Sequence, residues 1–241
     1  MLNRIRSVVF NLLFYVNTVV WLFAALPTFF LPYQAILEVA KAWARVNLVM
    51  LQGIVGIGYE IRGREKLPRG PYIVAAKHQS SWEIFALLPL FRSPTFIMKR
   101  ELQWVPIFGW YTIKGRMVPI DRAAGSQALK QMTERARLEL SRNRQLIIFP
   151  EGTRRPAGAE PRYKHGVAHL YAAEGVPCVP IALNSGLFWP RRSLRMRPGT
   201  VLVEILDPIQ PGLDENVFFE RLQQQIESAT ARLMAEAEQK T

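Results

Sequence analysis

A histidine and a glutamate five positions apart, His78 and Glu83, are the first candidates for acid–base chemistry in this chain. A neutral imidazole is suited to accept a hydroxyl proton near neutral pH, and a carboxylate on its other nitrogen fixes the tautomer and stabilises the imidazolium. On one continuous helix the two side chains would diverge. The spacing therefore predicts that His78 precedes a helix whose first turn contains Glu83, with His78 as general base.

The same two residues also have a structural interpretation. Ser80 and Glu83 form a capping-box pattern, in which the glutamate accepts a hydrogen bond at the start of a helix. His78 can likewise be a buried histidine satisfied by its neighbours. By themselves the two residues leave the catalytic and structural interpretations equally open, although the two oxygens of Glu83 can serve both.

A second string further along the chain suits an anionic group. It ends an apolar run with a carboxylate, a flexible glycine, a hydroxyl and a permanent cation: Phe149, Pro150, Glu151, Gly152, Thr153 and Arg154. Arginine can bind phosphate through two parallel hydrogen bonds and keeps its charge. The sequence contains no G-x-S-x-G nucleophile turn. We therefore expect a substrate hydroxyl, activated by the base, to attack an acyl thioester directly, without an acyl-enzyme.

The composition narrows the class of partner. The chain has 241 residues, 49% of them apolar and 21% charged, which excludes global disorder. Its net charge of +12 predicts an anionic partner. The sequence lacks zinc-finger spacing and the aromatic RNA-binding signature, so we expect no nucleic acid. The single cysteine, Cys178, lies in an apolar run and is expected to be inert, and we interpret His165 and His169 as structural, with no metal site.

The amino-terminal part of the chain is apolar. Residues 8–31 carry no charge and follow Arg4 and Arg6, and a helix of that length can cross a bilayer core. A signal peptide is the alternative, but the apolar stretch is long and no clear A-x-A cleavage site follows. Residues 35–57 carry Glu38, Lys41 and Arg45 on one helical face.

We predict that these two segments form a helical hairpin that anchors a basic domain to anionic lipid; the alternative is that the second helix packs on the domain. The predicted organisation is a membrane-anchoring helical pair at residues 1–57 and an α/β domain at residues 58–241. If the positive-inside rule applies to the basic amino terminus, the domain lies on the cytoplasmic side.

Short β-rich runs alternate with helical stretches in the remainder of the chain. Strands are expected at residues 59–62, 72–76, 95–98, 116–120, 145–149, 179–183 and 201–205. Helices are expected at residues 81–91, 125–142, 166–174 and 216–238. This alternation predicts an α/β fold, a mixed sheet flanked by helices. Ligands of such folds bind near the carboxyl ends of strands, where His78, Asp121 and the 151–154 string lie.

With these motifs the chain resembles the glycerolipid acyltransferase family, which includes the 1-acyl-glycerol-3-phosphate acyltransferases. The first family motif, a histidine followed by four residues and an acid, matches His78 to Glu83. The usual acid is aspartate, so Glu83 adds a methylene to the reach. The other motifs follow in order at residues 115–122, 149–154 and 176–180.

The resemblance implies roles for further residues. In the second motif Arg122 contacts the acceptor phosphate. In the third, Glu151 and Arg154, with Gly152 and Thr153 between them, organise the glycerol-phosphate site. The fourth forms an apolar wall near the acyl chain. Lys99 and Lys164 are additional cationic candidates for substrate binding.

The resemblance also implies an activity. The expected reaction moves a fatty acyl group from acyl-CoA or acyl-carrier protein to the sn-2 hydroxyl of lysophosphatidic acid, giving phosphatidic acid in phospholipid biosynthesis, with no cofactor besides the acyl donor. The expected location is a bacterial inner membrane, with the catalytic domain on the cytoplasmic side. The alternatives are another lyso-lipid acceptor such as a lyso-ornithine lipid, a membrane-bound thioesterase, and a non-enzymatic anionic-lipid-binding protein.

Overall fold

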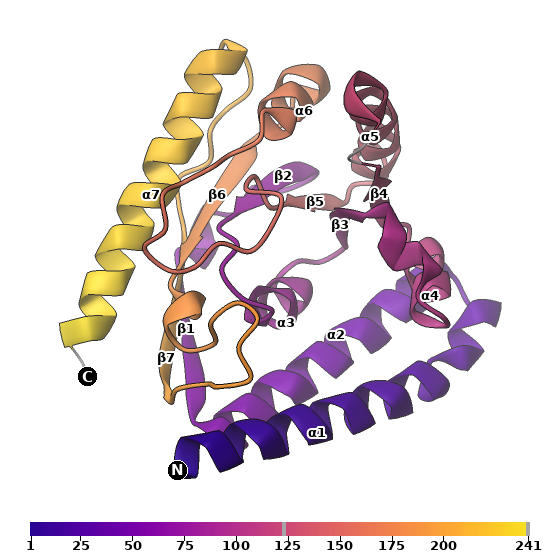
Figure 1. Ribbon diagram of the computed structural model, residues 1–241. Coiled ribbons are helices and arrows are strands. Elements are labelled where there is room, and N and C mark those ends of the chain that lie inside the picture. Colours follow the sequence, from indigo (N-terminus) through magenta and orange to yellow (C-terminus); the bar gives the residue numbers. More distant parts are fainter. Residues whose placement is uncertain (122–123, 240–241) are drawn as a thin grey trace.

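The computed structural model describes residues 1–121 and 124–239, and a seven-stranded sheet runs through them (Figure 1). The strands are β1 (Ile57–Arg62), β2 (Tyr72–Ala76), β3 (Pro94–Lys99), β4 (Val118–Ile120), β5 (Gln145–Ile148), β6 (Cys178–Leu183) and β7 (Gly199–Ile205). Their order is β1-β7-β6-β2-β5-β3-β4. Neighbouring strands are parallel except β6 and β7, which are antiparallel. The prediction of a mixed sheet is confirmed.

Helices cover both faces of this sheet (Figure 1). They are α1 (Leu2–Ala24), α2 (Tyr33–Met50), α3 (Trp82–Leu90), α4 (Phe108–Lys114), α5 (Gly125–Leu140), α6 (Gly166–Glu174) and α7 (Glu215–Gln239). Side chains alternate along β2: Val74 and Ala76 join the core formed with α1, α2 and α3, whereas Ile73 and Ala75 join the core formed with α5, α6 and α7. Both faces of the central strands are therefore apolar and buried.

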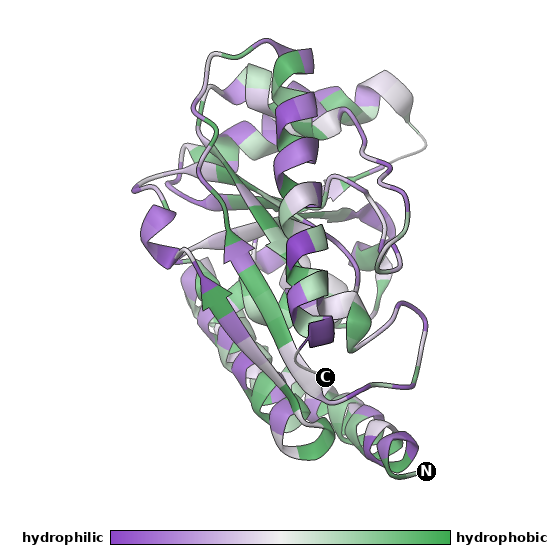
Figure 2. Cartoon of the chain, turned by 90° about the vertical axis from the view of Figure 1, so that its left-hand side faces the viewer, coloured by the Kyte–Doolittle hydropathy of each residue, from purple (hydrophilic) through white to green (hydrophobic). Residues whose placement is uncertain are grey.

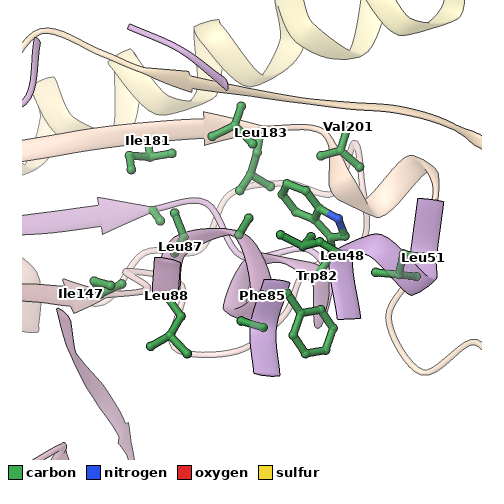
Figure 3. Close-up of a cluster of buried hydrophobic side chains, with 14 of the residues drawn as sticks. Leu48, Leu51, Trp82, Phe85, Leu87, Leu88, Ile147, Ile181, Leu183 and Val201 are labelled. Carbon is green, nitrogen blue, oxygen red and sulfur yellow. The ribbon is translucent and has the colours of Figure 1, made fainter. Parts of the chain in front are cut away.

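The larger core lies between the sheet and the α1–α3 layer. Figure 3 shows the indole of Trp82 between Leu183 and Val201 on the sheet side and Leu48 and Leu51 on the side of α2. Trp82 is 0% exposed and opens α3 directly after the loop that carries His78. Burying an aromatic side chain of this size stabilises a fold by roughly 1.5–3 kcal/mol or more. The packing of Trp82 thus fixes where α3 begins.

The outer layer is more polar. Figure 2 shows hydrophilic residues along the outward side of α7 and hydrophobic residues along the strands behind it. The inward side of α7 carries Phe218, Leu222, Ile226 and Leu233, each 0% exposed. This spacing of four, four and seven is that of one helical face, so α7 is held on the sheet by an apolar stripe.

The predicted strands and helices are found, with shifts at their ends, and some short elements were not predicted. The strand expected from Arg116 begins at Val118, because Arg116 has a left-handed backbone (φ 56°). Sequence reasoning missed α4 and the 3-10 turn η4 (Arg100–Trp104) before it. Both are too short for a helical period to be recognised. They cross closely at Gly109, where a Cβ would lie 1.9 Å from the Gln103 carbonyl oxygen.

The two amino-terminal helices pack on the α/β domain. The helix expected at residues 8–31 runs over Leu2–Ala24 and continues as a 3-10 turn, η1 (Leu26–Phe30). In α1, the Phe10 ring meets Trp189 at 5.7 Å and the Phe14 ring meets Phe85 of α3 at 5.8 Å. The Tyr111 hydroxyl of α4 donates to the Leu22 carbonyl at 2.6 Å.

Helix α2 is also part of the domain. It covers α3, and its Lys41 is only 5% exposed, with the ammonium 2.7 Å from both Glu38 Oε1 and the Arg92 carbonyl. After Met50 the chain continues through a π-helical turn, η2 (Leu51–Val55), into β1. The packing of α2 on the domain, one of the two sequence interpretations, is therefore found; the anchoring of the helical pair to lipid stays a prediction. The predicted boundary at residue 57 does not separate two cores, because both helices contribute to the larger one.

A buried arginine ties several elements together at the amino edge of the sheet. Arg144, directly before β5, is 0% exposed. Its guanidinium donates to Glu139 of α5 and stands 5.2 Å from the Tyr33 ring centroid of α2. It also donates to backbone carbonyls of the β3 and β4 approaches: Ser93, Pro94, Gly115 and Arg116. The charge is buried with most of its donors satisfied, which is the condition under which a buried ion is tolerated.

We expect Arg144→Met to lower the free energy of unfolding by about 3–5 kcal/mol, because the carbonyls and Glu139 lose their donor in a buried place. The matched control is Arg142→Ala, which removes a 41% exposed guanidinium from the other oxygen of the same glutamate and should cost less than about 1 kcal/mol. Denaturant unfolding in detergent measures both. Equal losses for the two variants would contradict this account of Arg144.

Candidate active site

The carboxyl ends of neighbouring parallel strands bring the predicted motifs together. Strands β2 and β5 pair in register from Tyr72 with Gln145 to Ala75 with Ile148. The chain leaves β2 into Lys77 and His78, and leaves β5 into Phe149 and the 151–154 string. Because β6 is parallel to β2, its carboxyl end opens at the same edge, where the 3-10 turn η5 (Ser185–Leu187) follows. The site is thus built where three strands end.

His78 and Glu83 are in contact as predicted. His78 Nδ1 lies 3.1 Å from Glu83 Oε2, and Glu83 is 0% exposed while the histidine side chain is 16% exposed. An ionised carboxylate can only accept, so the shared hydrogen is on Nδ1. The Nε2 lone pair is then left to accept a proton from a substrate. The His78 ring is stacked on Phe149 at 3.9 Å, which restricts its rotation.

Glu83 also bonds the backbone directly before its helix, so this carboxylate makes a structural contact as well as the contact with the histidine; its catalytic role stays a prediction. Its Oε1 accepts from the backbone N–H of Ser80 at 2.8 Å and of Gln79 at 3.3 Å. The Ser80 hydroxyl in turn accepts from the Trp82 N–H at 3.1 Å. These backbone donors compensate the cost of burying a charge. Backbone N–H groups of the loop before α3 therefore place the carboxylate that contacts the histidine.

The loop of the third motif forms hydrogen bonds with the backbone of His78. Glu151 Oε2 accepts from the His78 N–H at 2.9 Å, and the Arg155 N–H donates to the His78 carbonyl at 2.8 Å. Arg154 donates through Nη1 to the Ser81 hydroxyl. The two loops thus hold one another through backbone as well as side-chain bonds. His78 is fixed at its ring by Glu83 and at its main chain by Glu151.

A buried charge network stands behind Glu151. The Lys77 ammonium, 3% exposed, lies 3.0 Å from Glu151 Oε1 and 2.6 Å from Glu227 Oε1 of α7. The Tyr163 hydroxyl donates to the same oxygen of Glu227 at 2.8 Å. Burial raises the pKa of Glu151, and the Lys77 charge opposes that rise. Burial, with the neighbouring Glu227 charge, also raises the pKa of Tyr163, which stays a neutral donor.

The other predicted binding residues differ in their exposure. Gly152 (φ 64°) turns the chain and Thr153 is exposed. Lys99, at the end of β3, and Lys164 are exposed cations, and the Lys164 N–H donates to the Pro150 carbonyl at 2.8 Å. Arg154 is half-buried beside Ser81. Lys99, Lys164 and Arg154 bring positive charge to the carboxyl edge of the sheet, whereas Glu151 bonds Lys77 and the His78 backbone.

Arg122, predicted to contact a phosphate, lies outside the described residues. Its neighbour Asp121, for which a pair with Arg122 was the alternative, is 2.8 Å from Arg100. Arg116 of the same motif places its guanidinium over the Tyr33 ring at 4.8 Å. The roles of these cations in binding stay predictions.

Several residues of the site were not found by sequence reasoning. Ser185 of η5 donates its hydroxyl to Glu83 Oε1, and the Gln79 side chain accepts from the Gly186 N–H at 3.0 Å. The sequence motifs predict no role for Lys77, although it stands directly before His78. Glu227 lies on α7, far along the chain. The one available signal was Lys77 itself, a charge inside an otherwise apolar stretch.

Three residues that the sequence analysis interprets as non-catalytic have other surroundings. Cys178 is 0% exposed in β6, and burial raises the pKa of its thiol, which disfavours the reactive thiolate. His165 is stacked on Phe219 at 4.2 Å, and His169 is one turn further along α6. The fourth motif continues into β6, whose side chains are core residues on both faces of the sheet.

Comparisons with known proteins all find acyltransferases. A family model described as acyltransferase matches residues 58–184. A 1-acyl-sn-glycerol-3-phosphate acyltransferase of Pseudomonas aeruginosa is 35% identical over 97% of this chain and 92% of its own length. The enzyme of the same name from Cocos nucifera is 34% identical, and the alpha form from Homo sapiens is 32% identical. This chain spans 63% and 59% of those two proteins.

The fold has a solved counterpart. The crystal structure of the 1-acyl-sn-glycerophosphate (LPA) acyltransferase, PlsC, from Thermotoga maritima superposes with a TM-score of 0.81. The match covers 97% of this chain and 98% of that one, at 23% sequence identity. The amino-terminal helices are therefore included in the shared fold.

We expect Lys77→Met to destabilise the protein most at about pH 8 and progressively less toward about pH 5. The substitution removes the charge that lowers the pKa of Glu151, so the folded-state pKa rises further. When the pKa of a carboxyl is higher in the folded than in the unfolded state, its ionisation opposes folding. This cost is complete above the folded-state pKa and disappears as the pH falls to the unfolded-state pKa, where the group is protonated in both states. Unfolding free energies across this pH range measure the effect.

The matched control is Lys66→Met, which removes an outer lysine paired with Asp207 at 3.2 Å. Its cost should be small at every pH in this range. A destabilisation of Lys77→Met that does not change with pH would contradict the proposed coupling to Glu151.

Proposed function

Because the chain belongs to the acyltransferase family, we propose that it transfers a fatty acyl group to the sn-2 hydroxyl of 1-acyl-sn-glycerol-3-phosphate and forms phosphatidic acid. The donor is the thioester of acyl-CoA or of acyl-carrier protein. The observation that carries the proposal is the contact of His78 Nδ1 with the buried Glu83, 3.1 Å, which leaves Nε2 available as a base. The similarity to proteins named 1-acyl-sn-glycerol-3-phosphate acyltransferases supports this acceptor.

The reaction follows from this geometry. Nε2 of His78 removes the proton of the sn-2 hydroxyl as its oxygen attacks the thioester carbonyl carbon. The tetrahedral intermediate then collapses: the carbon–sulfur bond breaks, the ester forms, and the imidazolium returns the proton to the thiolate. Glu83 keeps the imidazole in the required tautomer and stabilises the imidazolium in between. No group on the protein is acylated.

The surrounding cations suit the acceptor. Arg154, Lys99 and Lys164 bring positive charge to the carboxyl edge of the sheet, and Arg122 belongs to the same set by its motif. A phosphate monoester and the phosphates of CoA are both attracted by such charges. We assign Glu151 a positioning role, because its oxygens bond the His78 N–H and Lys77 rather than facing a ligand.

The membrane interaction also belongs to the proposal. By length and composition, residues 2–30 form the one candidate span in the described part of the chain, and 11% of it is buried. Exposed apolar side chains repeat along one side of α1 and extend onto the segment around α4: Val8, Leu12, Val16, Val20, Phe23, Trp104, Trp110 and Ile113. The other side of α1 contacts α4, α3 and the loop after β6. We propose that α1 lies in the membrane interface along this apolar side.

A basic loop adjoins the amino end of α1. The Met196 N–H donates to the Ser7 hydroxyl at 2.9 Å, which sets the loop beside the helix. Its arginines, with those of the helix end, are Arg191, Arg192, Arg195, Arg197, Arg4 and Arg6. Clustered arginines beside an apolar helix are suited to anionic headgroups. The compartment and the cytoplasmic side of the membrane stay predictions from the sequence.

The chemical proposal is tested by transfer of labelled acyl groups from acyl-CoA and from acyl-carrier protein to lysophosphatidic acid in lipid. We expect phosphatidic acid from the wild type, and a loss of at least about 100-fold in kcat for His78→Ala. His169→Ala on α6 is the matched control and should keep full activity. Equal rates for His78→Ala and the wild type would sink the mechanism.

Two other outcomes identify the alternatives. Release of free fatty acid without an acceptor would indicate a thioesterase. Transfer to another lyso-lipid, but not to lysophosphatidic acid, would overturn the proposed acceptor and keep the chemistry.

The membrane proposal is tested by vesicle sedimentation. Replacing Arg191, Arg192, Arg195 and Arg197 together by glutamine should weaken binding to anionic vesicles by roughly 100- to 1,000-fold at low salt, and by less at high salt, because each basic residue near the surface contributes about 1 kcal/mol. The matched control replaces four exposed basic residues elsewhere, Arg69, Lys130, Arg135 and Arg221. Equal weakening by both sets would contradict a specific role for the loop.

A further inference from the structure

Ser185 is a polar group at the centre of the site that the reaction above does not use. It follows β6 in η5, is 0% exposed, and donates its hydroxyl to Glu83 Oε1. A side chain without exposure does not reach a substrate, so Ser185 is neither nucleophile nor ligand. Its contact is with the oxygen of Glu83 that does not touch the histidine.

The position of Ser185 is fixed from a second side. The next residue, Gly186, donates its N–H to the Gln79 side chain at 3.0 Å, and Gln79 is also 0% exposed. A Cβ at Gly186 would lie 3.0 Å from the Gln79 Cβ, so a glycine permits this close approach. The turn after β6 is therefore clamped onto the loop between His78 and Glu83.

We propose that Ser185 is a positioning residue of the reaction, forming with Glu83 and His78 a serine–glutamate–histidine relay. It acts on the histidine only through the carboxylate. This inference rests on the proposed function for its kinetic effect, but the hydrogen bonds themselves do not depend on the identity of the acceptor. Ser185 also lies just beyond the residues matched by the family model, which end at 184.

The physical reason lies in the length and burial of Glu83. A glutamate has one more rotatable bond than an aspartate, and a carboxylate held from one side can turn about that bond. Backbone N–H groups of Gln79 and Ser80 approach it from the loop, and the Ser185 hydroxyl approaches from the turn after β6. Donors from two separate segments fix the plane of the carboxylate, and with it the direction of the bond to Nδ1.

The kinetic test compares Ser185→Ala, Ser185→Thr and the wild type. Removing one charge-assisted bond should lower kcat about 10- to 100-fold and leave the KM for lysophosphatidic acid within about twofold, since no substrate contact is lost. Ser185→Thr keeps the hydroxyl and should recover part of the rate. Thr133→Val, which deletes a buried hydroxyl on α5, controls for general destabilisation and should not change kcat.

A double-mutant cycle shows whether Ser185 acts through Glu83. Residues that act as a unit are strongly non-additive, so Ser185→Ala should cost less than about threefold when added to Glu83→Gln. A full 10- to 100-fold further loss in that background would overturn the relay. So would a kcat of Ser185→Ala equal to that of the wild type.

A spectroscopic readout separates this proposal from the proposed function. The proton on His78 Nδ1, assigned by its loss in His78→Ala, should shift in the NMR spectrum of Ser185→Ala and stay unchanged in Thr133→Val. If the wild type fails to acylate lysophosphatidic acid but this shift is found, the acceptor is wrong and the relay stands. An unshifted proton would refute the relay whatever the activity.

Discussion

The parallel pairing of β2 with β5 is the constraint on which the site depends. In-register pairing sends both chains out of the sheet at one edge, so that the residues after Ala76 and after Ile148 meet. The backbone of His78 can then be bonded on both sides by the third motif, through Glu151 and the Arg155 N–H. A slip by one residue would move each side chain to the opposite face of the sheet, into the core to which its neighbour belongs, and would break these bonds. Core packing and the geometry of the site are set by the same register.

The site contains several buried charged groups. Each of those described below has hydrogen-bond donors or a charge of opposite sign beside it. Glu83 accepts from backbone amides, the histidine and a serine. Glu151 and Glu227 share Lys77. At the opposite edge of the sheet, Arg144 is surrounded by carbonyls and Glu139. Such networks are costly to break at a single member, so they hold the loops in one arrangement rather than adding much net stability.

The amino-terminal helices connect the exposed apolar side of α1 to this arrangement. Leu48 and Leu51 of the α2 segment pack under Trp82, the first residue of the helix that carries Glu83 (Figure 3). The aromatic contacts of Phe10 and Phe14 tie α1 to the loop after β6 and to α3. The helix that we propose to lie at the membrane and the helix that follows the His78 loop thus pack on the same core.

The sequence alone determined the elements and the local motif. Alternating patterns predicted the strands, and the five-residue spacing of His78 and Glu83, with Ser80 as cap, predicted their contact, because these signals depend on residues close in the chain. Tertiary structure alone decided the rest of the centre. Ser185 is 102 residues from Glu83 and Glu227 is 150 residues from Lys77. No local pattern encodes such pairs, since strand order and helix placement follow from how the whole core packs. For the same reason the sequence left open whether the second helix, α2, lies at a lipid interface or packs on the domain. The burial of Lys41 is a property of its tertiary neighbours, not of its own sequence.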